Sequence, residues 1–404
     1  MLNLFYFLGN YSLYSFTLFI IYIIMYAAVG IGGGYHADSQ SLEYIASKAI
    51  EEKIKLNICI IGAGTVGLSN AWRIKNDLND NAKVKVTIIS EKFYNETTSY
   101  GSGGLWEPYQ ILGTPDDKIN QWGKDAFDHF LELYNSPNGS EAGVQLLTAY
   151  NLLEEDQELI IPSWKDIVFN FQVLSNDDLQ KMSLPKRFVK GFTFGTLVID
   201  QKYYMRYMTN ELHKMGIKFI QQKVDRIEEL YNSNYDVIIN CTGLGSYTLL
   251  DDSLMYPIRG QVLRVKAPWM NNVWFFGSPT RYIIPNVDAV VIGGTAQKGN
   301  WDTNSSRDDI NSILDDVYDV FPSMQNAIIE STWAGLRPGR TPVRLESETI
   351  KTNNNKDILL VHCYGHGGSG ITLAMGCAAD VVNNHIKAKF QFQLSDWIRH
   401  RSKL

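Results

Sequence analysis

Residues 56–78 read LNICIIGAGTVGLSNAWRIKNDL, and this stretch decides the fold. The apolar run at residues 56–61 predicts a strand that leads into a glycine-rich turn, GAGTVG, at residues 62–67. Small and apolar residues then recur at helical spacing, and a second apolar strand, VKVTIIS, ends just before Glu91. A strand, a GxGxxG turn, a helix, a second strand and an acidic residue in this order predict a Rossmann-type dinucleotide-binding domain.

The glycines of this turn let the backbone approach a pyrophosphate, and the helix that follows supplies N–H groups for its charge. The acidic residue after the second strand can accept hydrogen bonds from a ribose hydroxyl. The motif alone does not distinguish NAD from FAD, but a second glycine-rich loop at residues 97–105 favours a cofactor that lies extended along the domain. The candidate cofactor-binding residues in this half are Gly62, Ala63, Gly64, Val66, Gly67, Glu91, Lys92, Thr97, Thr98, Ser99, Gly104 and Leu105.

A second glycine-rich segment lies near the other end of the chain, KDILLVHCYGHGGSGITLAMGCAADVVNNHI at residues 356–386. An apolar strand at residues 358–361 meets a glycine loop, and a helix is expected to begin near Ile371. The N-terminus of that helix would stabilise the negative charge of a reduced flavin. His362 and His366 are four residues apart, but one is expected in the strand and the other in the loop, so no metal site is predicted.

This segment resembles the signature of the D-amino-acid oxidase family. IIGAGTVGLS, TTSYGSGGLWEPY, NCTGLGS, RGQVLRVKAPW, RYIIPN and GLRPGRTPVRLE resemble other family segments, and they follow the family's order. The resemblance runs from about residue 56 to the C-terminus and is closer to the D-aspartate oxidase branch. Cys363 is a departure, because the family usually has Asn, His or Ala there.

The resemblance implies an α/β fold with FAD as the cofactor. A discontinuous, Rossmann-like FAD-binding domain would be joined to a substrate domain built on a mixed sheet. The expected segments are residues 53–110, 190–250 and 335–390 for the FAD-binding domain, residues 111–189 and 251–334 for the substrate domain, residues 1–52 for an apolar leader and linker, and residues 391–404 for a tail.

The resemblance also assigns roles in a reaction. Arg337, in GLRP, would bind the α-carboxylate of a D-amino acid through its planar guanidinium, and the hydroxyl of Tyr282, in RYIIP, would assist. Hydride transfer from Cα to the flavin would give an imino acid that hydrolyses to a 2-oxo acid and ammonia, while O₂ becomes H₂O₂. The remaining implied FAD-binding residues are Val224, Cys241, Gly243, Gly367, Gly368, Ser369, Gly370, Ile371 and Thr372.

The branch resemblance favours D-aspartate or D-glutamate, whose second carboxylate needs a second cation. Two positions where the aspartate branch would carry arginine are occupied here by the apolar stretch 274–276 and by Ala296. Arg281 or Lys298 could substitute, and a pocket for neutral D-amino acids is the alternative. An NAD-dependent dehydrogenase and a non-catalytic flavin-binding or membrane-tethered protein are the other hypotheses.

Two possible targeting signals lie at the ends of the chain. The terminal Ser402, Lys403 and Leu404 form a signal that the peroxisomal import receptor reads, whereas the apolar residues 13–32 have the length of a membrane span or signal-peptide core. A peroxisomal location is expected, because peroxisomes dispose of H₂O₂, with the secretory pathway or a membrane as the alternative. The net charge of −6 argues against a nucleic-acid partner.

Overall fold

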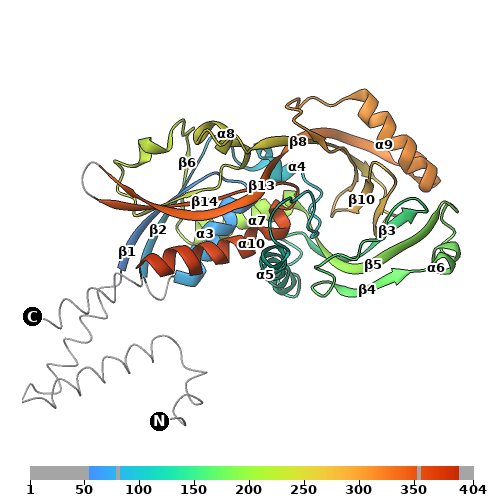
Figure 1. The fold of residues 1–404 in the computed structure, drawn as a ribbon, viewed down its shortest axis with the longest axis horizontal. Coiled ribbons are helices and arrows are strands. Elements are labelled where there is room, and N and C mark those ends of the chain that lie inside the picture. The colour runs from blue at the N-terminus through green and yellow to red at the C-terminus, as the bar shows by residue number, and fades with distance from the viewer. Residues whose placement is uncertain (1–53, 79–81, 353–355, 391–404) are drawn as a thin grey trace, which may run out of the picture. The chain divides into compact units, whose positions relative to one another are not determined.

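The computed structural model describes residues 54–78, 82–352 and 356–390, so the predicted leader, tail and Ser-Lys-Leu ending lie outside the described residues. Its strands form one sheet in the order β4-β5-β3-β9-β10-β11-β8-β13-β14-β7-β1-β2-β6, and β12 pairs with β8. Figure 1 shows the two ends of this sheet, which differ in strand direction and in the helices that cover them.

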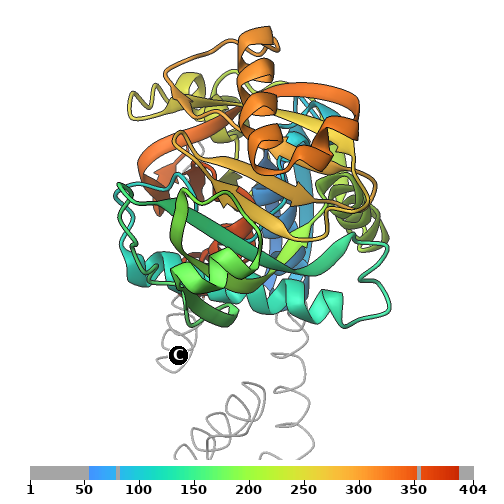
Figure 2. The same ribbon diagram turned by 90° about the vertical axis from the view of Figure 1, so that its right-hand side faces the viewer.

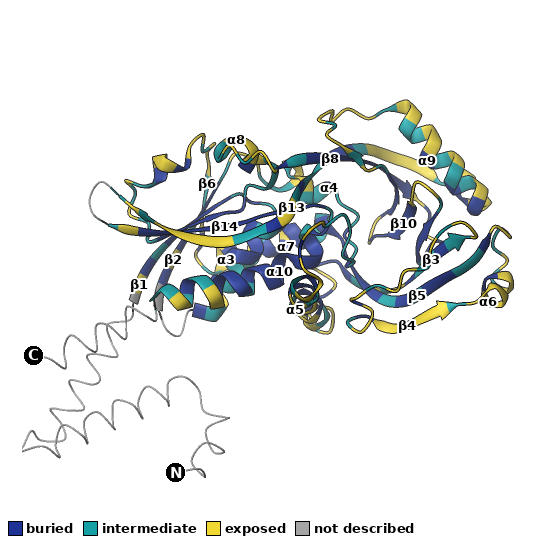
Figure 3. Ribbon diagram, viewed as in Figure 1, coloured by how far each residue is buried: buried dark blue, intermediate teal, exposed yellow. Residues whose placement is uncertain are grey.

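One end of the sheet contains the predicted dinucleotide-binding unit. Parallel pairs join β1 to β7, β7 to β14 and β2 to β6. The strands at this end are β1 (Ile54–Ile61), β2 (Ala82–Ser90), β6 (Lys218–Gln221), β7 (Val237–Asn240) and β14 (Asp357–His366), and its helices are α3 (Thr65–Leu78), α5 (Asp116–Tyr134), α7 (Gln201–Lys214) and α10 (Gly370–Asp380). Because the strands are covered by helices, β1, β7 and β14 read as nearly continuous apolar runs and are buried. In Figure 3 the inner strands at this end of the sheet are largely in the dark blue of buried residues.

The other end of the sheet is mostly antiparallel and carries α9 on one face (Figure 2). Ile313 and Val317 of α9 pack with Leu263, Ile283 and Ile292 of the sheet in one core cluster. The elements here are β3 (Val144–Glu154), β4 (Phe169–Leu174), β5 (Phe188–Ile199), β8 (Tyr256–Lys266), β9 (Val273–Phe276), β10 (Arg281–Pro285), β11 (Val290–Gly293), β12 (Gln297–Lys298), α6 (Asn176–Lys181) and α9 (Arg307–Val320).

A single long strand, β13 (Ile328–Lys351), joins the two ends of the sheet. It pairs with β8 from Ile328 to Gly339 and with β14 from Gly339 to Lys351. The shorter elements are η1 (Tyr94–Glu96), α4 (Thr98–Gly101), η2 (Ile227–Leu230), η3 (Gly243–Gly245), α8 (Ser246–Leu249), η4 (Pro322–Asn326) and the π-helix η5 (Val381–Lys387). Within the described part of the chain, no helix is long and apolar enough to cross a membrane.

Two elements make contacts outside the segments to which the predicted domains assign them. β5, expected within the FAD-binding segment 190–250, pairs along its length with β3 in the substrate part. α5, expected in the substrate segment 111–189, packs on α10, where Trp122 Nε1 donates a hydrogen bond to the Asp380 carboxylate at 2.8 Å. Neither location follows from the local pattern, because a long antiparallel ladder and a helix–helix contact are tertiary features.

Candidate functional site

A cavity of about 470 Å³ lies at the carboxyl ends of β1, β7 and β14. Loops that leave neighbouring parallel strands meet at this edge, which is where such sheets bind ligands. The cavity therefore collects residues that are far apart in the sequence. The predicted cofactor-binding residues that line it are Gly62, Ala63, Gly64, Val66, Glu91, Lys92, Thr97, Thr98, Ser99, Val224, Cys241, Gly243, Gly367, Gly368, Gly370 and Ile371.

The glycine turn after β1 has the conformation that its sequence predicts. Gly62 has φ +106°, and a Cβ there would stand 2.5 Å from the Cys241 carbonyl oxygen. At the start of α3, the Thr65 N–H donates to Ser99 Oγ at 3.0 Å, which ties the second glycine-rich loop to the first. The turn thus presents backbone rather than side chains to the cavity.

The residues around this cavity fit a dinucleotide such as FAD. The turn before α3 and the glycine loop before α10 both open onto it, so two helix N-termini are available for phosphate or flavin charge. Glu91 and Lys92, at the carboxyl end of β2, are exposed and also line it. His366 lines the cavity as well, and its buried Nε2 has no hydrogen-bond partner among the described residues. That nitrogen is available to a bound group.

Five predicted cofactor-binding residues do not line this cavity, and three of them, Gly67, Ser369 and Thr372, line neither this cavity nor the smaller one beside it. Gly67 is in α3, where a Cβ would overlap the Gly62 carbonyl. Ser369 Oγ accepts from the Tyr109 N–H at 2.7 Å and donates to the Tyr109 carbonyl at 2.8 Å. Thr372 Oγ1 bonds in the same two ways to the backbone of Glu107, at 3.2 and 2.9 Å. Both side chains fasten the loop at residues 105–110 to the start of α10.

A smaller cavity of about 110 Å³ lies between that loop and strands β8, β10 and β13. Gly104 and Leu105, the other two predicted cofactor residues, line this one. Tyr282 and Arg337, the predicted catalytic pair, line it as well, although they are 55 positions apart in the chain. The two cavities are neighbours, because both are lined by Thr98, Ser102, Arg337, Gly368 and Ile371.

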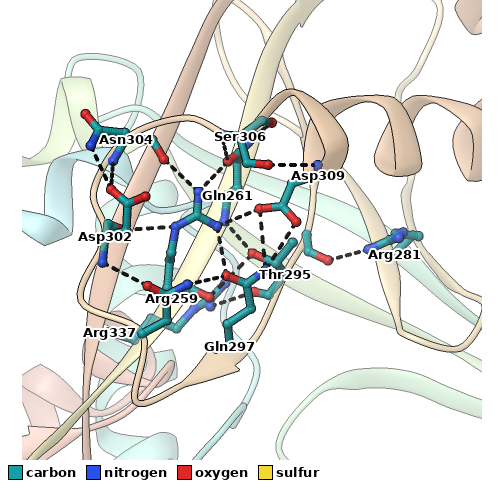
Figure 4. A network of polar contacts seen from close by, with 12 residues as sticks. Arg259, Gln261, Arg281, Thr295, Gln297, Asp302, Asn304, Ser306, Asp309 and Arg337 are labelled. Carbon is teal, nitrogen blue, oxygen red and sulfur yellow. Dashed lines mark hydrogen bonds and ion pairs between the residues drawn. The ribbon is translucent and has the colours of Figure 1, made fainter.

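The Arg337 guanidinium is held at the wall of the smaller cavity. Its Nη1 donates to the Thr295 carbonyl at 2.9 Å, a bond that Figure 4 shows beside the polar network of Arg259. The guanidinium also lies over the Tyr109 ring, 5.7 Å from its centroid, and occupies the space that a side chain at Gly260 would fill. Since Nη1 is fixed to the protein, the rest of the planar group is oriented and remains available to an anion.

Tyr282 is the hydrogen-bonding neighbour of Arg337 in this cavity. Burial is the main cause that raises the pKa of its phenol, and the nearby Arg337 charge and hydrogen bond oppose that rise. The phenol therefore keeps its proton at neutral pH, and it can donate a hydrogen bond to an anion on the guanidinium. Together, the two groups make a site for one carboxylate.

Arg281 and Lys298, predicted to bind an acidic side chain, do not line either cavity. Successive residues of a strand point to opposite faces, so Arg281 faces α9 while Tyr282 faces the cavity. The Arg281 guanidinium donates to Asp316 at 2.6 Å and, through Nη1 and Nη2, to the Gly294 carbonyl and Ser312 Oγ at 2.7 Å each. Arg281 is labelled at the edge of the polar network in Figure 4. Lys298 is exposed, with its ammonium 4.3 Å from the Tyr256 ring centroid.

One acidic residue of the smaller cavity, Glu107, was missed by the sequence reasoning. Glu107 lines the cavity, and burial raises the pKa of its carboxyl to about 8. The signal was present in GLWEPY, where Glu107 is the one charge in an apolar and aromatic stretch. A charge in such a stretch is unusual and is a reason to look for a functional role.

Comparison with known proteins agrees with this geometry. The family described as FAD dependent oxidoreductase matches residues 57–383. The chain is 33% identical to the D-aspartate oxidase of Homo sapiens over 80% of this chain and 93% of that protein, and 34% identical to the D-amino acid oxidase of Dugesia ryukyuensis over 81% and 96%. The glycine oxidase structure from Geobacillus kaustophilus superimposes with a TM-score of 0.65 at 17% identity, covering 82% of this chain and 95% of that one, and shares the fold.

Proposed function

This chain belongs to the family of FAD-dependent oxidoreductases that contains the D-amino-acid and D-aspartate oxidases, and on that premise we propose how its residues carry out the reaction. The protein is an FAD-dependent enzyme that deaminates D-amino acids oxidatively. Its substrates are a D-amino acid and O₂. The observation that carries the assignment of roles is the Arg337–Tyr282 pair on a cavity next to the larger one.

We assign the larger cavity to FAD, which when bound supplies the acceptor for the hydride that leaves the substrate Cα. Arg337 binds the α-carboxylate through the part of its guanidinium that Thr295 does not occupy. Tyr282, which is protonated at neutral pH, donates a hydrogen bond to the same carboxylate. These two contacts fix the orientation of Cα in a small cavity, and correct orientation supplies much of the rate acceleration. The imino acid that forms then hydrolyses to a 2-oxo acid and ammonia.

The substrate class that this cavity suits best is a D-amino acid without a second carboxylate. Arg337 is the one lysine or arginine among the described residues that line it. Because Arg337 pairs with the α-carboxylate, no second cation of the cavity is left for a carboxylate in the substrate's side chain. A second candidate is D-aspartate or D-glutamate, since relatives from Homo sapiens and Caenorhabditis elegans are named D-aspartate oxidase. The preference for acidic substrates, which the sequence resemblance favoured, is therefore kept as the second candidate.

The test is anaerobic reduction of the purified holoenzyme. We expect D-alanine to bleach the flavin absorbance faster than D-aspartate, and L-alanine to leave it unchanged. Faster bleaching by D-aspartate would select the second candidate, and a flavin that no D-amino acid reduces would contradict the function. Replacing Arg337 with Lys, which removes the bidentate geometry, should lower kcat/KM for each D-substrate by about 10- to 100-fold with FAD retained. A loss of FAD instead would place Arg337 in cofactor binding.

For the location of the enzyme we propose the peroxisome. The support is chemical, because an oxidase that passes electrons to O₂ makes H₂O₂, and Ser402, Lys403 and Leu404 form a peroxisomal address. Residues 13–32 support the alternative of the secretory pathway or a membrane.

A further inference from the structure

An acidic residue, Glu107, lines the smaller cavity, and none of the described residues forms an ion pair with it. Its backbone is held by Thr372 Oγ1 through two hydrogen bonds, so the residue has a fixed position. Burial is the one cause that shifts the pKa of its carboxyl, to about 8, and no hydrogen-bond donor or cation among the described residues offsets it. By surface area the residue is half-buried, and an acid that lines a cavity without a protein partner is a candidate for a functional role.

The other ionisable groups of this cavity are already engaged with one another. Arg337 bonds to Thr295, contacts Tyr282 and lies over Tyr109, and none of these contributes to the shift at Glu107. The cavity thus has a carboxylate-binding pair at one place and an uncompensated acid at another. A substrate that satisfies both carries a carboxylate and a cation.

We propose that Glu107 is a specificity residue that receives an ammonium or guanidinium group at the end of the substrate's side chain. The inference rests on the proposed function and narrows it to basic D-amino acids such as D-lysine, D-ornithine and D-arginine. A carboxylate that is partly screened from water attracts a cation more strongly than the same carboxylate does in bulk solution. The second carboxylate of D-aspartate would instead meet the negative charge of Glu107.

A comparison of D-lysine with D-norleucine measures the contribution of the contact between Glu107 and the side-chain cation. D-Norleucine has the chain length of D-lysine but ends in a methyl group, so the two molecules share their α-amine, α-carboxylate and Cα–H. For the wild-type holoenzyme we expect kcat/KM to be about 10- to 100-fold higher for D-lysine than for D-norleucine, the range of a charge-assisted hydrogen bond. Equal values, or a preference for D-norleucine, would overturn the proposal.

The ratio of the two kcat/KM values should also depend on pH in a defined direction. Glu107 is neutral below its pKa of about 8 and becomes an anion above it. The D-lysine side chain stays charged to about pH 10. The ratio should therefore rise between pH 6 and pH 9, while titration of the shared α-amine cancels. A ratio that does not change with pH would contradict a titrating carboxylate at the side-chain end.

Variants distinguish this role from the alternatives. Glu107→Gln should lower kcat/KM for D-lysine by at least about tenfold and that for D-norleucine by less than about threefold, with FAD content unchanged, and Glu107→Asp should restore part of the loss. Equal losses for both substrates would assign Glu107 to the α-amine, and loss of FAD would assign it to the cofactor; either result overturns the proposal.

Glu132→Gln on the exposed face of α5 is the matched control. If neither substrate bleaches the wild-type flavin, the proposed function itself has failed.

Discussion

Arg281 and Tyr282 are adjacent in β10, but they lie on opposite faces of the sheet and have different roles. Tyr282 lies on the cavity with Arg337, whereas Arg281 is buried on the opposite face and bonds to Asp316, Ser312 and a backbone carbonyl. Charge and proximity in sequence suggest a substrate contact for Arg281. Strand alternation excludes it from the cavity face.

A stability measurement tests this assignment of Arg281. Arg281→Ala should lower the free energy of unfolding by about 2–4 kcal/mol, because three hydrogen bonds of a charged group are lost and their acceptors stay behind. The ratio of kcat/KM for D-aspartate and D-alanine should change by less than about twofold. Urea unfolding of the holoenzyme and steady-state kinetics measure the two quantities. Lys298→Ala, an exposed control, should alter stability by less than about 0.5 kcal/mol. A selective loss with D-aspartate would restore Arg281 as a substrate residue.

The predicted cofactor residues that line the larger cavity and those that do not differ in a physical respect. Gly62 and Gly64 belong to a local turn whose conformation their type dictates, and both line the larger cavity. Ser369 and Thr372 are in the equally recognisable second loop, yet their hydroxyls bond to the backbone at Tyr109 and Glu107. A motif specifies backbone geometry, but the partner of a rotatable hydroxyl depends on which distant loop packs there.

At the scale of elements, the packing of α5 on α10 is the feature with the least signal in the sequence. α5 is separated from α10 by more than 200 residues, and the two meet where Trp122 crosses Gly376. A Cβ at Gly376 would overlap the Trp122 backbone, so the close approach depends on a missing side chain. GxGxxG and strand periodicity predicted the core of the cofactor unit, whereas this contact required the folded chain.

Substitution of Gly376 tests how much this contact supports the fold. Gly376→Ala should lower the free energy of unfolding by about 1–3 kcal/mol, since the added methyl forces the two helices apart. Gly370→Ala is the control in the same helix, because a Cβ there meets nothing within 4 Å among the described residues. The control should be neutral or slightly stabilising, as alanine favours helix over glycine. Chemical unfolding of both variants without cofactor measures the difference. Equal stability of the two would show that α5 and α10 adjust without strain.

For the whole molecule, the sequence has one possible targeting signal at each end, and the two signals cannot both direct the same polypeptide. The Ser-Lys-Leu signal is read on chains that are made in the cytosol, whereas a working signal peptide diverts the chain before that. We expect the Ser-Lys-Leu signal to be the one that operates, because every turnover yields H₂O₂ and peroxisomes remove it.

Localisation of the untagged, full-length protein tests that argument. Antibody staining should coincide with a peroxisomal marker, and deletion of residues 402–404 should move the protein to the cytosol, because the receptor then has nothing to bind. Deletion of residues 13–32 is the matched change at the other end and should leave the peroxisomal pattern intact. Staining of the endoplasmic reticulum that this second deletion abolishes would reverse the assignment. The leader would then be the operative address, and the H₂O₂ would be released in a compartment that must dispose of it by other means.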